Sequence, residues 1–218
     1  MSRVRRITLV QRIGYESLRP FARLLSAILF RIDVFGRHHI PKDGGVLVCA
    51  NHQSLIDPVL VGLCCNRRLN YLARRTLFDH RALGALIHFL DTIPLDRDGL
   101  GVEGLKETIR RLKAREMVLI FPEGTRSRDG ELRTLKPGLC AVAKRAGAAL
   151  LPVGIDGAHR AWPIGARFPR PARIAIDFGA PIRAEDAVEP SAENLLAELE
   201  SRMRACHARA RAAISRSG

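Results

Sequence analysis

The chain of 218 residues carries 36 Lys and Arg against 22 Asp and Glu, a formal net charge of +14. Its length fits one domain with a full core, and its hydrophobic fraction of 47% is ordinary for a globular protein. Such a charge favours an anionic partner, whether nucleic acid, acidic lipid or an acidic carrier protein. Aromatic residues are few and are not interleaved with basic ones as in single-strand binders, so we expect no nucleic-acid partner.

A strongly basic segment opens the chain at residues 1–35. Eight arginines against two acidic residues within 1–37 leave a local net charge of +6. Apolar residues from Leu18 to Ile32 recur three and four apart, and charged residues recur at the same spacing on another face, namely Arg12, Glu16, Arg19 and Arg23. This pattern predicts an amphipathic helix lying in a membrane interface, with a surface helix packed on the domain as the alternative.

The longest apolar stretch of this segment is too short to cross a bilayer. It runs from Leu24 to Phe30, is interrupted by Ser26, and is bounded by Arg23 and Arg31. A membrane-spanning helix needs about 20 apolar residues. The basic N-terminus also lacks the long apolar core of a signal peptide. We therefore expect no transmembrane span.

From residue 44 onward, short apolar runs alternate with helical periodicity. Predicted strands cover residues 46–50, 69–73, 92–95, 117–121, 150–154 and 173–178, and predicted helices cover 58–65, 77–90, 101–115 and 138–147. Repeated strand–helix units predict an α/β fold, a single domain with a largely parallel mixed sheet flanked by helices. Residues 156–172, rich in Gly, Pro and Arg, are predicted to form a loop.

The chain closes with a predicted helix over residues 191–216, whose last turns are basic. We therefore divide the chain into the basic segment 1–35, a central domain 36–190 and a C-terminal basic helix 191–218. Five cysteines stand mostly in apolar neighbourhoods without a C-x-x-C pair, namely Cys49, Cys64, Cys65, Cys140 and Cys206. They are predicted to be buried thiols, and neither a zinc site nor a disulfide framework is expected.

A loop with a histidine and a carboxylate follows the predicted strand 46–50, in the run Asn51-His52-Gln53-Ser54-Leu55-Ile56-Asp57. Because proline suits the first turn of a helix, Asp57-Pro58 predicts a helix start with Asp57 as its N-cap. The same carboxylate can accept a hydrogen bond from one imidazole nitrogen of His52, so that the other nitrogen can take a proton from a hydroxyl. The alternative for His52 alone is a structural histidine. Ser54 has no Gly-x-Ser-x-Gly surroundings and is interpreted as a residue that orders the loop.

Two further strand ends carry basic residues. Phe121-Pro122-Glu123-Gly124-Thr125-Arg126-Ser127 follows one of them, and residues 91–97 span the other. Glycine lets the backbone approach a ligand, Thr and Ser supply donors, and the planar fork of Arg126 suits a phosphate. Glu123 is interpreted as orienting an arginine, and a solvated basic turn is the alternative for this loop. Because the carboxyl ends of parallel strands lie together, we expect His52, Arg97 and Arg126 to line one cleft.

These motifs resemble those of the glycerolipid acyltransferase family, and within it the 1-acyl-sn-glycerol-3-phosphate (lysophosphatidate) acyltransferases. The resemblance covers about residues 36–180 and rests on four ordered blocks: NHxxxxD at 51–57, an arginine block at 91–97, FPEGTRS at 121–127, and Leu150-Leu151-Pro152-Val153-Gly154. Asp91 and Pro94 stand where the family usually has Gly and an aromatic residue, and Leu135 and Pro137 where it often has Phe and Lys. These departures bear on the acceptor more than on the chemistry.

The resemblance implies a glycerolipid acyltransferase-like fold with an acyl-transfer site. His52 would be the general base and Asp57 would orient it, while the acceptor-phosphate side would be formed by Arg97, Glu123, Gly124, Thr125 and Arg126. Asn51 and Ser54 are further candidates for substrate binding. Leu151-Pro152-Val153 would line the acyl channel or pack beside it. The implied reaction moves a fatty acyl chain from acyl-CoA or acyl carrier protein to the sn-2 hydroxyl of lysophosphatidate, which gives phosphatidate. A thioester donor needs no covalent enzyme intermediate, and we expect no metal and no bound cofactor.

The implied partners are an anionic membrane surface, a lysophospholipid acceptor and the acyl donor. The implied location is the cytoplasmic face of the cell membrane, with peripheral or monotopic attachment. Two alternatives stay open. One is the same chemistry on another lysophospholipid, a lyso-ornithine lipid or glycerol 3-phosphate. The other is a non-enzymatic basic membrane-binding protein, which leaves the two main motifs unexplained.

Overall fold

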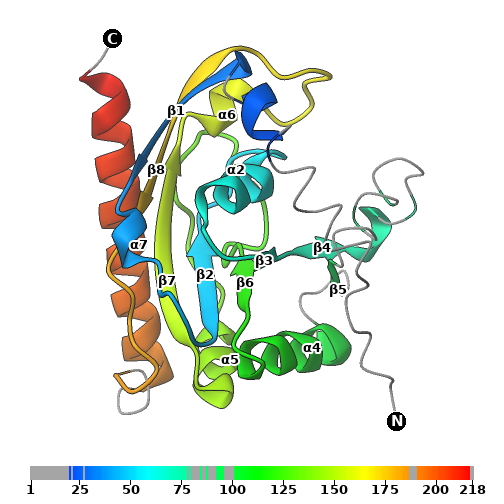
Figure 1. Cartoon of the computed structure of the whole chain (residues 1–218), viewed down its shortest axis with the longest axis vertical. Coiled ribbons are helices and arrows are strands. Elements are labelled where there is room, and N and C mark those ends of the chain that lie inside the picture. Colours follow the sequence, from blue (N-terminus) through cyan, green and yellow to red (C-terminus); the bar gives the residue numbers. More distant parts are fainter. Residues whose placement is uncertain are drawn as a thin grey trace.

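A mixed six-stranded sheet forms the centre of the molecule (Figure 1). The computed structural model describes residues 20, 22–26, 28–77, 79, 84, 87, 92–95, 101–186 and 191–216. The strands of this sheet are β1 (Phe30–Phe35), β2 (Val46–Ala50), β3 (Leu69–Asn70), β6 (Met117–Ile120), β7 (Ala149–Asp156) and β8 (Ala172–Phe178), in the order β1-β8-β7-β2-β6-β3. Strands β7, β2, β6 and β3 run parallel, whereas β8 is antiparallel to β7 and parallel to β1. The predicted largely parallel mixed sheet is confirmed.

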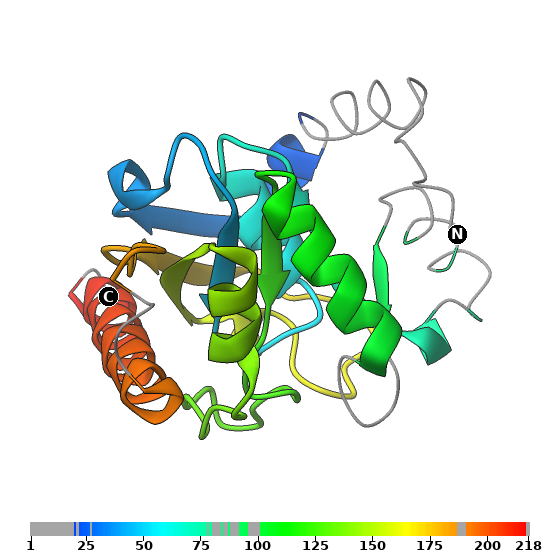
Figure 2. The same cartoon turned by 90° about the horizontal axis from the view of Figure 1, so that it is seen from below.

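Helices cover both faces of this sheet. They are α2 (Asp57–Cys64), α4 (Gly101–Lys113), α5 (Leu139–Ala146), α6 (Ala158–Ala161) and α7 (Ala192–Ser215), with short 3-10 turns η1 (Arg37–His39) and η2 (Arg75–Leu77). Because side chains alternate along a strand, Val46 and Val48 of β2 pack in one core with α2, while Leu47 and Cys49 pack in the other with α4, α5 and α7. Figures 1 and 2 show α7, α5 and α4 in that order across the sheet. All five cysteines are buried, as predicted.

Helix α7 packs closely along β7 and β8 (Figure 1). Its first turn is capped by Ser191, whose Oγ accepts a hydrogen bond of 3.1 Å from the backbone N–H of Asn194. A stripe of apolar residues at helical spacing faces the sheet, namely Leu195, Leu199 and Met203. Gly154 permits this close approach, since a Cβ there would lie 2.2 Å from the backbone nitrogen of His207. The predicted C-terminal helix is therefore confirmed, and it is part of the folded domain.

Two predicted strands are arranged differently from the expectation. The run 69–73 is divided at Tyr71 into β3, which joins the main sheet, and β4 (Leu72–Arg74). Strand β5 (Ile93–Leu95) pairs in parallel with β4 in a separate two-stranded sheet. The end of β5 consequently does not belong to the edge that carries the other two motifs. The predicted helix 77–90 lies largely outside the described residues, among which residues 84 and 87 are helical.

The N-terminal segment that was predicted to be helical contains strand β1. Residues 22–26, 28 and 29 are helical, but Phe30–Phe35 forms β1, which pairs with β8 from Phe30 opposite Ala172 to Phe35 opposite Asp177. Pairing with β8 outweighs the three-and-four spacing that extended to Ile32. Most of the predicted amphipathic helix lies outside the described residues, and its membrane contact stays a prediction. Within the described part of the chain, no helix has both the length and the apolar character that crossing a bilayer requires.

Candidate active site

The turn after β2 brings His52 and Asp57 into contact. Nδ1 of His52 lies 2.8 Å from Oδ2 of Asp57, whose side chain is fully buried, while the His52 side chain is 19% exposed. The same Oδ2 accepts hydrogen bonds from the backbone N–H groups of Gln53, at 2.6 Å, and Ser54, at 2.7 Å. With Nδ1 as the donor to Asp57, Nε2 carries the lone pair and is the nitrogen that can accept a proton. The predicted His–Asp pair is confirmed as a contact.

The predicted N-cap role of Asp57 is wrong. Asp57 is the first residue of α2, and the N-cap position is occupied by Ile56, which makes no side-chain cap hydrogen bond. The carboxylate turns back to the loop before the helix, because its Oδ2 is shared by the imidazole and two backbone N–H groups there. Asp57 therefore organises the loop that holds His52, and not the start of its own helix.

Phe121 holds the imidazole from the neighbouring strand end. The rings of His52 and Phe121 stack with their centroids 3.9 Å apart and an angle of 15° between their planes. Stacking on one face and a hydrogen bond at Nδ1 together restrict the rotation of the His52 ring. The sequence motif contained Phe121, but its spacing carried no signal for this contact.

Glu123 joins the two motif loops. Its Oε1 accepts a hydrogen bond of 2.7 Å from the backbone N–H of His52, and its Oε2 accepts one of 3.0 Å from the backbone N–H of Arg133. The expectation that Glu123 orients an arginine side chain is therefore wrong, since its two oxygens hold backbone amides. Burial raises the pKa of Glu123, against the opposing effect of the two backbone hydrogen bonds. A further bond of 2.7 Å from the N–H of Ser127 to the carbonyl of His52 completes the link between the loops.

A cationic hollow lies beside this link. It has a volume of about 450 Å³ and is lined by Thr125, Arg126, Arg128, Arg133 and Ile164. Three guanidinium groups and a hydroxyl are donors that suit a phosphate. Gly124, with φ of 72°, lets the loop turn against Lys136, whose Cε would lie 2.7 Å from a Cβ at that position. Arg133 and Ile164 were not predicted as parts of this site. Arg133 lies several residues after the motif, and Ile164 lies beyond the next strand, β7.

Asn51 and Ser54 attach the histidine loop to the rest of the domain. The buried amide of Asn51 donates to the carbonyl of Ile155, at 2.9 Å, and accepts from its N–H, at 2.7 Å. The hydroxyl of Ser54 donates to the carbonyl of Trp162, at 2.9 Å, which agrees with a loop-ordering role. Contact of Asn51 or Ser54 with a substrate stays a prediction. Arg97 lies outside the described residues, and its place in the cleft also stays a prediction.

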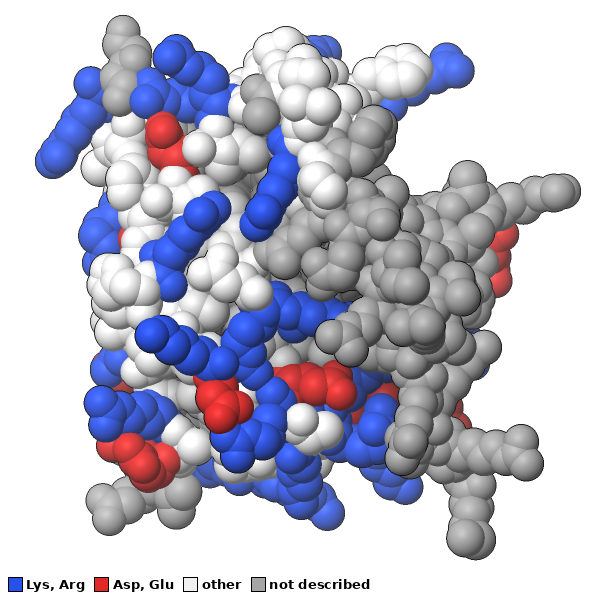
Figure 3. All heavy atoms as spheres, viewed as in Figure 1, with Lys and Arg blue, Asp and Glu red and all other residues white. Residues whose placement is uncertain are grey.

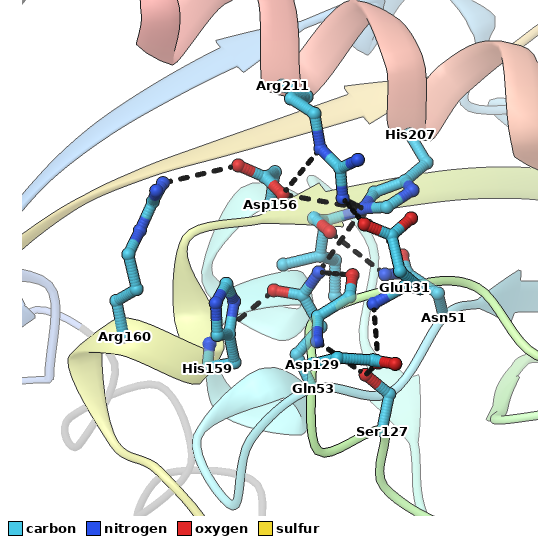
Figure 4. Close-up of polar contacts among 12 residues, drawn as sticks. Asn51, Gln53, Ser127, Asp129, Glu131, Asp156, His159, Arg160, His207 and Arg211 are labelled. Atoms are coloured by element: carbon cyan, nitrogen blue, oxygen red, sulfur yellow. Dashed lines mark hydrogen bonds and ion pairs between the residues drawn. The ribbon is translucent and has the colours of Figure 1, made fainter.

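Gln53 is a buried hub that sequence reasoning missed (Figure 4). Its Nε2 donates to the carbonyl of Gly130, at 2.6 Å, and lies 3.2 Å from Nε2 of His207 on α7. Its Oε1 accepts from the N–H of His159, at 3.4 Å. One side chain thus connects the histidine loop with the FPEGTRS loop, with α6 and with α7. Gln53 and His207 are 154 residues apart, and no local pattern relates them.

Charged groups surround this hub on the α7 side. Asp156 Oδ1 lies 3.4 Å from Nε2 of His207 and 3.5 Å from Arg211, which also pairs with Glu131 at 2.8 Å. Burial acts to raise the pKa of Asp156, but His207, Arg211 and Arg160 together hold it below its usual value. Figure 4 shows these side chains converging between α7, the end of β7 and the two loops. The network therefore ties the C-terminal helix to the loop that carries His52.

An imidazole that donates to a buried carboxylate, next to a cationic hollow, is an arrangement that suits transfer of a group to the hydroxyl of an anionic acceptor. The comparisons with known proteins name the group. Residues 31–156 match the family described as Acyltransferase, and the chain belongs to that family. It is accordingly an acyltransferase.

Similar proteins support this assignment over most of the chain. The 1-acyl-sn-glycerol-3-phosphate acyltransferase of Bacillus subtilis is 27% identical over 172 residues, which cover 78% of this chain and 83% of that protein. The enzyme of the same name from Limnanthes douglasii is 30% identical over 158 residues, 71% of this chain and 56% of that protein. The crystal structure of the 1-acyl-sn-glycerophosphate (LPA) acyltransferase from Thermotoga maritima has a TM-score of 0.79 and 26% identity, and the match covers 95% of this chain and 83% of that one. The predicted acyltransferase fold is confirmed.

Proposed function

We propose that the protein transfers a fatty acyl chain from a thioester, acyl-CoA or acyl carrier protein, to the sn-2 hydroxyl of lysophosphatidate, and so makes phosphatidate for phospholipid synthesis. The observation that carries this proposal is the direct link between the His52–Asp57 pair and the arginine-lined hollow. The backbone N–H of His52 donates to Glu123, and the carbonyl of His52 accepts from the N–H of Ser127. These two hydrogen bonds hold the His52 loop against the loop that lines the hollow. The similar proteins named above, which are acyltransferases of 1-acyl-sn-glycerol-3-phosphate, support the same acceptor.

This geometry supports the following chemistry. Nε2 of His52 takes the proton of the acceptor hydroxyl while the hydroxyl oxygen attacks the carbonyl carbon of the thioester. The carbon–sulfur bond of the thioester then breaks. The departing thiolate takes the proton from the imidazolium, which Asp57 stabilises at 2.8 Å. One ester forms, one thiol is released, and the enzyme returns to its starting state. A positioned base of this kind contributes on the order of 10²–10⁴ in rate.

The hollow would hold the acceptor phosphate through Arg126, Arg128, Arg133 and Thr125. Binding the phosphate there places the rest of the acceptor near the histidine loop and turns a bimolecular reaction into a positioned one. Because this contact needs only a phosphate, another lysophospholipid or glycerol 3-phosphate is the second candidate acceptor. An anionic membrane surface, met from the cytoplasmic side, is the proposed location, which the net charge of +14 supports.

An acceptor panel tests this proposal. The purified full chain is supplied with acyl-CoA or acyl carrier protein and with lysophosphatidate, other lysophospholipids, a lyso-ornithine lipid or glycerol 3-phosphate, and the products are identified by mass spectrometry. We expect phosphatidate from lysophosphatidate as the fastest product. Faster acylation of another acceptor would transfer the proposal to that acceptor, and no product with any acceptor would refute it.

A further inference from the structure

Exposed apolar side chains gather at the edge of the sheet that carries His52. Strands β1 and β8 run opposite to β2, β6 and β7, so the starts of the first two lie at the edge where the other three end. Helical residues up to 29 lead into β1, and residues 162–171 lead into β8. Of the nine large apolar side chains that are exposed among the described residues, seven belong to these segments or to the start of α2: Leu24, Leu25, Ile28, Leu55, Val59, Ile164 and Phe168.

The loop 162–171 is held in shape by its own hydrogen bonds. The indole N–H of Trp162 donates to the carbonyl of Ala166, at 2.9 Å, and the N–H of Arg170 donates to the carbonyl of Ala161, at 2.7 Å, which closes the base of the loop. Phe168 at its tip is nevertheless 68% exposed. A rigid loop that presents an aromatic side chain to solvent avoids the entropy cost of ordering when that side chain is buried by a partner.

This loop stands next to the proposed phosphate site. Its first residue, Trp162, accepts the hydrogen bond from Ser54 in the histidine loop, and Ile164 lines the hollow together with Arg126 and Arg128. The apolar tip and the cationic hollow are therefore neighbours, and both open at the same edge as His52. Figure 1 shows the yellow loop at the end of the molecule where α2 and α6 also lie.

Basic side chains accompany the apolar ones. Arg167 and Arg170 of the loop are exposed, and the guanidinium of Arg167 lies 5.5 Å from the centre of the Phe168 ring. In Figure 3, Lys and Arg side chains surround uncharged ones along the upper edge of the molecule. Apolar tips flanked by arginines match a bilayer interface, because the tips enter the acyl region while the guanidinium groups remain at the lipid phosphates.

We infer that the loop 162–171 docks on an anionic lipid bilayer by inserting Phe168, with Ile164 beside it, so that the hollow and His52 open at the level of the lipid headgroups. This inference rests on the proposed function, because a lysophospholipid acceptor has its phosphate at that level and its acyl chain below it. The docking loop lies beyond residues 31–156, the range that the family match covers. It is also a different segment of the chain from the predicted basic helix at the N-terminus.

Flotation of the full-length protein with vesicles tests the docking loop. The vesicles contain phosphatidylcholine with or without phosphatidylglycerol, and no acceptor or donor is added. The variant Phe168→Ser is compared with Val102→Ser, since both wild-type side chains are 68% exposed. Val102 belongs to α4, which lies away from this edge (Figure 1). We expect Phe168→Ser to lower partitioning onto anionic vesicles on the order of fivefold, as loss of an inserted aromatic side chain would, with Val102→Ser unchanged and Phe168→Trp restoring it.

Three results would overturn the inference. The first is equal vesicle binding by wild type and Phe168→Ser, and the second is an equal loss of vesicle binding in Val102→Ser and Phe168→Ser. The third is normal vesicle binding by Phe168→Ser together with a loss of turnover only when acyl carrier protein is the donor. The last result would make the loop a docking site for the carrier protein. Turnover of a short-chain, monomeric lysophosphatidate is measured in parallel and should be the same in Phe168→Ser and wild type. Absence of that turnover in the wild type would refute the proposed function, while the vesicle result would still decide the docking loop.

Discussion

The two ends of the parallel strands both carry a hollow of similar size, and only one of them is arranged for chemistry. The hollow at the start of β2 and β7 has a volume of about 410 Å³ and is lined by both cations and anions, among them Lys42, Asp43, Arg183 and Glu185. Both of its acids are paired, since Asp43 binds Arg115 and Glu185 lies 3.5 Å from Arg183. The hollow at the carboxyl ends of the strands is lined by three arginines and no acid. Charge, and not cavity size, distinguishes the candidate site.

The histidines at the two ends differ in the same way. His39 lies at the first hollow, and its Nδ1 donates to the backbone carbonyl of Phe178, at 2.7 Å. His52 donates instead to a fully buried carboxylate. A carbonyl fixes the position of an imidazole, whereas a carboxylate also stabilises the charge that the ring acquires when it takes a proton.

Replacing Asp57 by Asn should abolish most of the activity. The amide keeps the size of the side chain but removes the charge that stabilises a protonated His52, so we expect kcat to fall on the order of 10²–10⁴. Steady-state thiol release measures it, and thermal unfolding shows whether the variant is folded. Asp43→Asn at the opposite end is the matched control and should keep wild-type kcat. A folded Asp57→Asn variant with wild-type kcat would contradict the role of this carboxylate.

Neutralising the hollow should weaken acceptor binding. Arg126→Gln and Arg133→Gln each remove a charge-assisted hydrogen bond to phosphate, so we expect KM for the acceptor to rise on the order of tenfold. Because the thioester lies outside this contact, KM for the donor should change less. Arg183→Gln, in the hollow at the other end, is the control. Equal effects of all three substitutions would mean that net charge alone, and not the hollow, binds the acceptor.

Disconnecting Gln53 should lower kcat while leaving acceptor KM nearly unchanged. His207→Leu removes the imidazole that Gln53 contacts at 3.2 Å and should reduce kcat by about tenfold, because loosened positioning of a catalytic loop costs rate. His207→Gln retains a hydrogen-bond acceptor and should recover part of that loss. If both variants lose the same stability and His207→Gln has a kcat as low as that of His207→Leu, then His207 supports the fold and does not position the loop.

The Asp156 carboxyl should make the protein sensitive to acid. Its pKa is lowered from 3.8, so its contribution to the free energy of unfolding is complete above that value and is lost as the pH falls through the lower folded pKa. Asp156→Asn removes this dependence. Denaturant unfolding between pH 6 and about pH 3 should therefore show a difference between wild type and variant that shrinks as the pH falls. A difference that grows on acidification would mean that the pKa of Asp156 is raised.

Local sequence patterns predicted the central strands and the His–Asp contact because both features depend on residues that are close together in the sequence. Val46–Ala50 has the predicted bounds, and His52 and Asp57 are joined by a turn of a few residues. The same pattern could not identify β1, since Phe30–Phe35 fits a helical spacing until β8 pairs with it.

Long-range partners explain the remaining errors. Glu123 binds two backbone amides, one of them 71 residues away, and backbone partners leave no mark in a sequence. The N-cap expectation for Asp57 failed because the preceding loop, and not the helix, uses the carboxylate. The hub at Gln53 depends on α7 returning to the sheet at Gly154, a tertiary contact that no local motif encodes.

Product formation by two histidine variants tests the central claim most directly. The full-length protein, His52→Ala and His39→Ala are each incubated with an acyl thioester and lysophosphatidate, and phosphatidate is measured by mass spectrometry together with thiol release. We expect His39→Ala to make phosphatidate at nearly the wild-type rate and a folded His52→Ala to make it at least about a hundredfold more slowly. Wild-type turnover in His52→Ala, or an equal loss in both variants, would contradict the assignment of His52 as the base.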